Sequence, residues 1–191
     1  MNPNKKEERM RSESIVQSKA KNRVEGLNPS LEAFIADLSS HDDVVRIKAR
    51  HSLVAMGKAA VPSLIEALKQ TDDQVRREAV RALSLIEDPE VAPVLVRTLE
   101  DEEFDIRWLA AEGLIELGAR GLKPLLQALI DRGNSSLLLE GAHHVIHYMA
   151  KGGLRKHLGP VLASLEGIEP SVKAPVAAYH GLEMLREAKI I

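Results

Sequence analysis

The apolar positions of this chain recur in one pattern at a nearly constant spacing. A phrase of the form Val-Arg-x-x-Ala-x-x-x-Leu begins at Val45, returns at Val75, and appears with isoleucine in first place at Ile106. The spacing is 30 and then 31 residues. Self-similarity at a fixed period of this size is typical of a stack of like units, each packed on its neighbours. The chain is therefore predicted to be a repeat protein.

Each repeat is predicted to contain two helices. Val45, Ala49 and Leu53 lie on one face of a helix, because they are four residues apart. A second apolar phrase follows each first one, in residues 64–68, 95–99, 125–129 and 161–165. Proline opens these second helices, and glycine or aspartate occupies the turns, as expected at helix ends. Turn chemistry and periodicity thus agree on helical hairpins.

The whole pattern predicts an all-α solenoid of about ten helices. A lone second-type helix is expected at about 29–40, four helical pairs follow, and a closing first-type helix is expected at about 171–188. Residues 1–27 hold many charges and few apolar anchors. They are predicted to form a charged, flexible arm or a partly helical cap, outside a solenoid domain of residues 29–188.

The repeats resemble the HEAT repeat family and, in their short units and Asp-x-Val-Arg phrasing, the HEAT-like repeats of phycobilin lyases. The residues that carry the resemblance are Asp43, Val45, Arg46, Ala49, Leu53, Pro62 and Leu68, then Asp73, Val75, Arg76, Ala79, Leu83, Pro93 and Leu99, then Asp105, Ile106, Arg107, Ala110, Leu114, Pro124 and Leu129. The resemblance implies a right-handed α-solenoid whose second helices line a concave groove. It does not fix a function, because the family contains scaffolds, adaptors and some enzymes.

Composition narrows the function classes. The chain has no cysteine, which excludes disulfides, thiolate metal sites and cysteine nucleophiles, and which fits a cytoplasmic location. It has no apolar run long enough to cross a membrane. The formal charge is −2, but residues 1–28 hold seven Lys or Arg against four Glu, so the remainder carries −5. An acidic body argues against nucleic acid as the partner.

An aspartate precedes the repeated arginine in every copy. The functional interpretation is a row of phosphate-binding arginines. The structural interpretation, which we favour because acids recur beside the bases, is a ladder in which each arginine bridges its own and a neighbouring aspartate. The predicted ladder consists of Asp43, Arg46, Asp73, Arg76, Asp105 and Arg107.

The polar side of the second helices is the predicted binding surface. Solenoids bind extended peptides or domains along such a groove. Trp108, the single tryptophan, either anchors a partner or packs on the next first-type helix, and a basic insert with a Gly-Gly hinge at residues 151–157 is either a binding loop or a long turn. The predicted partner contacts are Glu66, Lys69, Arg97, Glu100, Asp101, Gln127, Trp108, Arg155 and Lys156.

The segment His143-His144-x-x-His147 is the one candidate for metal binding. Histidines at i and i+4 can share an ion, but a third ligand is needed, and Glu140 is the only nearby acid in the sequence. The apolar neighbours favour histidines in the core or at a turn. We therefore predict no metal and no cofactor.

No nucleotide-binding loop or nucleophile elbow is present in the sequence. The favoured prediction is a non-catalytic, cytoplasmic scaffold or adaptor that binds another protein through its groove and is not an enzyme. The alternative, implied by the resemblance, is a phycobilin-lyase-like protein, either an enzyme or an auxiliary factor, that holds a tetrapyrrole in the groove.

Overall fold

The computed structural model describes residues 30–86 and 88–191, and the predicted arm at 1–27 lies outside them. Within these ranges the chain forms ten α-helices and no strand. The all-α prediction is confirmed. The helices are α2 (Leu31–Asp37), α3 (Asp43–Met56), α4 (Val61–Ala67), α5 (Asp73–Ile86), α6 (Ala92–Thr98), α7 (Phe104–Leu117), α8 (Ala119–Arg132), α9 (Ser136–Met149), α10 (Arg155–Glu166) and α11 (Pro170–Glu187).

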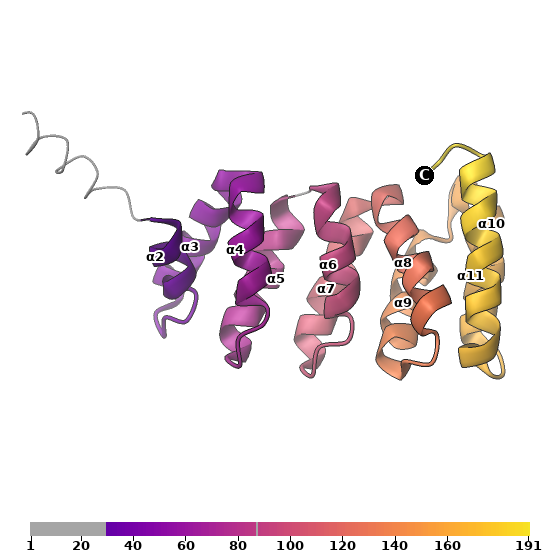
Figure 1. Cartoon of the computed structure of the whole chain (residues 1–191), viewed down its shortest axis with the longest axis horizontal. Coiled ribbons are helices and arrows are strands. Elements are labelled where there is room, and N and C mark those ends of the chain that lie inside the picture. Colours follow the sequence, from indigo (N-terminus) through magenta and orange to yellow (C-terminus); the bar gives the residue numbers. More distant parts are fainter. Residues whose placement is uncertain (1–29, 87) are drawn as a thin grey trace, which may run out of the picture.

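Helical hairpins stack side by side in two rows (Figure 1). The A row contains α3, α5, α7 and α9, each packed on the next, and the B row contains α2, α4, α6 and α8. Helices α4 and α6 are each preceded by a short 3-10 turn, η1 (Gly57–Ala60) and η2 (Pro89–Val91). The predicted α-solenoid of helical hairpins is therefore observed.

Local sequence explains where the helices begin and end. The side chain of Asp42 accepts a hydrogen bond from the N–H of Val44 and so caps α3. Gly57 and Gly118 end α3 and α7 with the same backbone, at φ 57° and 58° and ψ −134°. A Cβ added at either glycine would meet no other atom within 4 Å, so the positive φ, rather than lack of space, favours glycine there.

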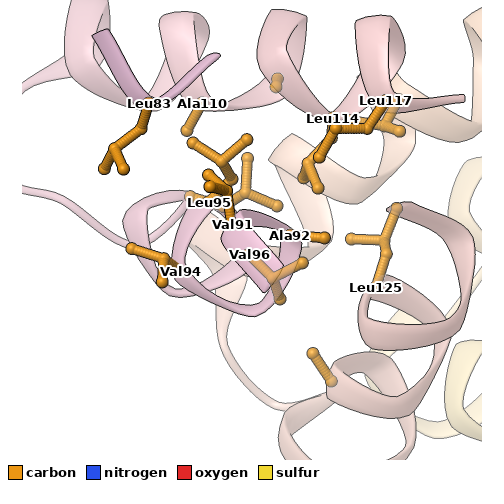
Figure 2. Close-up of a cluster of buried hydrophobic side chains, with 14 of the residues drawn as sticks. Leu83, Val91, Ala92, Val94, Leu95, Val96, Ala110, Leu114, Leu117 and Leu125 are labelled. Atoms are coloured by element: carbon orange, nitrogen blue, oxygen red, sulfur yellow. The ribbon is translucent and has the colours of Figure 1, made fainter. Parts of the chain in front are cut away.

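The repeated leucines and alanines form a continuous core between the rows. Leu83 of α5, Leu95 of α6 and Leu114 of α7 belong to this core, and each is at most 1% exposed (Figure 2). Full burial of such a side chain contributes about 1.5–3 kcal/mol. Gly113 brings α7 close to its neighbours, because a Cβ there would lie 2.3 Å from the hydroxyl oxygen of Ser84 and 2.9 Å from a methyl group of Leu95.

The alternation of helices between the two rows changes at the C-terminal end. Helix α11, predicted to close the row of first-type helices, packs instead on α8 and α10, while α10 packs on α9 (Figure 1). Residues 150–154 separate α9 from α10, whereas only Gly118 separates α7 from α8. The longer connection places α10 beyond α9, so that α11 covers the end of the B row. Gly133 permits this contact, since a Cβ there would lie 2.4 Å from the ring of Pro175.

Among the helices of residues 30–86 and 88–191, none has the length and the apolar character that a membrane span requires.

Candidate functional site

The three repeated arginines share one structural task. Each donates a hydrogen bond from Nη1 to the backbone carbonyl six residues earlier, in the turn that leads into its own helix. The distances are 2.6 Å from Arg46 to Ser40, 3.1 Å from Arg76 to Gln70 and 2.9 Å from Arg107 to Asp101. A guanidinium satisfies such loop carbonyls well, because its donors form a rigid fork. The repeated arginine thus fixes the turn within its own repeat.

The carboxylate partners of these arginines do not repeat. Arg46 pairs with its own Asp43, whereas Arg76 bonds Asp101 of the following turn at 3.0 and 3.2 Å. The guanidinium of Arg107 lies 5.6 Å from the ring centre of Phe104.

Another bridge from one repeat to the next is made by a residue outside the predicted ladder. Arg77, one position after the repeated arginine, bonds both Asp73, at 2.9 Å, and Asp105. These bonds lower the pKa of both aspartates below the ordinary value. These contacts therefore do not form a single ladder of aspartates and repeated arginines.

The predicted groove contains a hollow of about 370 Å³ between α4 and α6, with a mixed lining that includes the charged residues Lys69, Arg97, Glu100 and Asp101. Two of its acids are engaged across the stack, since Glu100 pairs with Arg132 and Asp101 with Arg76.

The other predicted contacts lie outside the lining of this hollow. Glu66 bonds Lys69 at 2.6 Å, and Gln127 bonds Asp131 at 3.0 Å on α8. Arg155 and Lys156 are exposed in the first turn of α10, at the far end of the stack (Figure 1). Glu66 therefore adjoins the hollow through Lys69, whereas Arg155 and Lys156 are separate from it.

A second hollow, of about 240 Å³ and mostly apolar, lies in the A row between α7 and α9. Trp108 forms its wall; the side chain is 45% exposed, and its ring centre lies 4.3 Å from that of His144. Nε2 of His144 lies 2.9 Å from a carboxylate oxygen of Glu112. Trp108 therefore packs on the next A-row helix and also presents surface to solvent.

Phe104 and Trp108 together form an aromatic ridge between two hollows. Their ring centres are 6.3 Å apart, and both residues also line a hollow of about 420 Å³ beside α5 that includes Arg81. Arg107 lines the hollow on the α9 side. The ridge thus has an arginine on each side. Phe104 was missed from the sequence, although an aromatic pair at i and i+4 is a detectable signal in a chain with 3% aromatic residues.

His143 and His147 lie on the outer side of α9, with 43% and 63% of their side chains exposed. Of the two predicted environments, the core and a turn, the core is therefore wrong for both, and His147 stands in the last turn of α9. The buried stripe of α9 runs instead through residues such as Ala142, Val145 and Ile146. Glu166, at the end of α10, places one carboxylate oxygen 3.3 Å from Nε2 of His143 and 3.8 Å from Nδ1 of His147. Because Glu166 belongs to another helix, no local motif revealed it.

The similarity of this chain to known proteins agrees with the repeat pattern of its sequence. Residues 61–146 match the family described as HEAT repeats. The chain is 30% identical over 132 residues to the bilin biosynthesis protein RpcF of Synechococcus sp., covering 68% of this chain and 62% of that protein. It is 31% identical over 163 residues to the phycocyanobilin lyase subunit alpha of Nostoc sp., covering 76% and 57%.

Among solved structures, the CpcE–CpcF complex of phycocyanin lyase from Nostoc sp. matches with a TM-score of 0.46 and 23% identity, covering 82% of this chain and 66% of that one. The predicted likeness to HEAT-like repeats of the phycobilin-lyase type is confirmed by the sequence matches. The chain spans 57% to 62% of the length of the two curated relatives described above.

Two predictions are overturned by these relatives. The expected non-catalytic scaffold and the expected absence of enzymatic activity do not agree with relatives that are named as lyase subunits and as a bilin biosynthesis protein. The error arose because the repeats, which dominate the sequence, report the fold alone.

Proposed function

We propose that this chain is a bilin-binding protein of the phycobilin-lyase kind, a lyase subunit or an auxiliary factor, and that it holds an open-chain tetrapyrrole against the Phe104–Trp108 ridge. The observation that carries the proposal is a half-exposed aromatic ridge with a hollow and an arginine on each side. Relatives named for bilin chemistry supply the ligand class.

The chemistry of a bilin matches the ridge. A bilin has a conjugated, largely apolar chain of four pyrrole-type rings and two propionate groups. Trp108 and His144 offer aromatic faces for stacking on the rings, a contact worth about 0.5–1.5 kcal/mol beyond area burial. Arg81 and Arg107, on opposite sides of the ridge, offer positive charge to the two propionates. Arg81 also pairs with Glu78, and Arg107 also bonds its own turn. Glu140 lines the same hollow and offers an acceptor for pyrrole N–H groups.

The size of the hollows supports binding across the ridge. The hollow between α7 and α9 has about 240 Å³, which is below the roughly 300–1,000 Å³ typical of ligand pockets, so it accommodates part of a tetrapyrrole. The adjoining hollow adds about 420 Å³ on the other side of Trp108. The chain has no cysteine, so it holds the ligand without a thioether bond.

This placement differs from the B-row groove predicted for a tetrapyrrole. The hollow between α4 and α6 is more polar and has no aromatic side chain in its lining on which the rings of a bilin could stack. A protein partner accords with this function, because the relatives in Nostoc sp. and Synechococcus elongatus are named subunits. The cytoplasmic location and the exclusion of nucleic acid stay predictions.

The test is a titration of the purified full chain with phycocyanobilin, followed by visible absorption and by quenching of the fluorescence of Trp108, the single tryptophan. We expect a changed bilin spectrum, and a loss of affinity of about tenfold or more in Trp108→Ala, because the main stacking surface is removed. Trp108→Phe retains a ring and should lose less.

Arg97→Ala is the matched control in the B row, where the side chain is exposed beside the hollow between α4 and α6. It should bind bilin as the native chain does. An unchanged bilin spectrum with the native chain would disprove the proposed function. If the Trp108→Ala variant still binds bilin and the Arg97→Ala variant does not, the binding site is the B-row groove and not the ridge.

A further inference from the structure

We infer that His143, His147 and Glu166 form a binding site for a zinc-like divalent metal ion at the joint between α9 and α10. The inference goes beyond bilin binding and does not depend on it. It also opposes the prediction from sequence that the chain binds no metal. One ligand atom from each of the three residues lies within 4.8 Å of the others.

Two helices supply the ligands. His143 and His147 are one turn apart on α9, and their ring centres are 5.8 Å apart. Glu166 is the last residue of α10, and its carboxylate faces both rings. Two imidazoles and one carboxylate are a donor set that suits zinc and neighbouring transition metals.

Two of the three distances between the ligand atoms are close to those around a small ion. Metal–ligand bonds of about 2.0–2.2 Å in a tetrahedron place the ligand atoms about 3.3–3.6 Å apart. The carboxylate oxygen of Glu166 is 3.3 Å from Nε2 of His143 and 3.8 Å from Nδ1 of His147. The side chains are about half exposed, so small rotations bring the second distance into this range.

A simple hydrogen-bonded pair explains this cluster less well. His144 and Glu112, on neighbouring helices, form such a pair at 2.9 Å, the usual length for N–H···O. In the cluster, one oxygen lies near two ring nitrogens, and neither distance is as short as in that pair. An ion between the three groups accounts for their convergence.

The site would act as a clamp. It joins α9 to α10 across the long connection at residues 150–154, at the point where the alternation between the two rows changes. Zinc hydrolases with the pattern His-Glu-x-x-His use that glutamate as general base, but His144 occupies its position here. We therefore assign ion binding and no catalytic step.

The experiment uses the full chain without a histidine tag, stripped with a chelator and free of bilin, which itself binds metals. Zn²⁺ is titrated by calorimetry, and Co²⁺ is added to detect the visible absorption of a tetrahedral cobalt centre. We expect one ion per chain. At a hundredfold excess over Kd, Zn²⁺ should raise the melting temperature by about 5–10 °C.

His147→Ala and Glu166→Gln should each weaken binding by more than the roughly 10- to 100-fold that loss of an outer-shell partner costs. Glu166→His replaces one ligand by another and should retain a cobalt spectrum. His180→Ala removes an exposed histidine of α11 and is the matched control, with unchanged affinity expected. Far-UV circular dichroism verifies the fold of each variant.

The inference is overturned if the native chain takes up neither Zn²⁺ nor Co²⁺ at one ion per chain. It is equally overturned if folded His147→Ala and Glu166→Gln bind as tightly as His180→Ala does. Because bilin is absent from these measurements, the outcome is separate from that of the bilin titration.

Discussion

Helix α7 packs on α5 on one side and on α9 on the other. Both joints involve the same repeat positions, but the side chains at those positions differ in their chemistry. On the α5 side, Arg76 and Arg77 reach across to Asp101 and Asp105. On the α9 side, the equivalent positions are Arg107, which binds its own turn, and Trp108, which packs on His144. One joint is ionic and the other is aromatic.

Substitution in the next repeat explains the difference. Thirty-one residues after Asp101 and Asp105 stand Arg132 and Ser136, neither of which can accept an ion pair from an arginine. Arg132 pairs instead with Glu100. A repeat can therefore keep its core and its turns while every joint has its own side-chain contacts, and the joint without an arginine–aspartate pair is the one where Trp108 is exposed.

The largest expected loss of stability comes from a steric clash at the joint between α5 and α7. Gly113→Val should lower the free energy of unfolding by about 1–3 kcal/mol, because its side chain overlaps Ser84 and Leu95. The measurement is urea unfolding of the native chain and the variant.

Gly153→Val is the matched control, since a Cβ there meets nothing within 4 Å. It should change stability by less than about 0.5 kcal/mol. Equal losses in the two variants would show that Gly113 is not a packing constraint.

Arg76→Lys should weaken the same joint by about 1–2 kcal/mol, since lysine cannot bond Asp101 and the two turn carbonyls at Gln70 and Thr71 together. The exposed Arg97 provides a comparison, because Arg97→Lys should be neutral. Urea unfolding measures both, and a neutral Arg76→Lys would contradict the fork-like role of the guanidinium.

Trp108→Ala should weaken the α7–α9 joint by about 1 kcal/mol, through loss of the contacts with His144 and Phe104. This loss should hardly change as NaCl is raised to about 1 M, whereas the loss in Arg77→Met should shrink, because salt screens ion pairs. Matched salt series of thermal unfolding measure both. Parallel salt dependence would refute the contrast between the two joints.

The smallest expected effect is on the pH dependence of the melting temperature. The pKa of Asp105 is lowered from 3.8, chiefly by its hydrogen bond from Arg77. Its stabilisation is therefore complete above the ordinary aspartate pKa and is lost as the pH falls through the lower folded-state value. Arg77→Met should flatten the decline of melting temperature below about pH 4. Asp105→Asn should flatten it too, and additive effects in the double variant would argue that the two residues act independently.

The amino-acid pattern predicted the scaffold well because it depends on local rules. The closing helix, expected at about 171–188, is observed at Pro170–Glu187, and the lone first helix, expected at about 29–40, is Leu31–Asp37. The function prediction was wrong, since the repeats encode packing, whereas Phe104 and Trp108, which we propose to bind bilin, stand at positions where the repeat varies. Glu166 escaped notice because its partners lie on another helix, whereas the pair of Phe104 and Trp108 stands on one helix and was detectable from the sequence.

The sequence by itself determined that this chain stacks helical hairpins, through its repeat period, the apolar stripe of each helix and the residues of its turns. The backbone needs of each turn and the burial of each stripe are satisfied within a repeat or its nearest neighbour. Only the tertiary structure decided which side chains meet across the joints, that α11 covers α8, and that His143, His147 and Glu166 converge. Those contacts depend on how far helices slide and turn against each other, which the close packing of all side chains sets together.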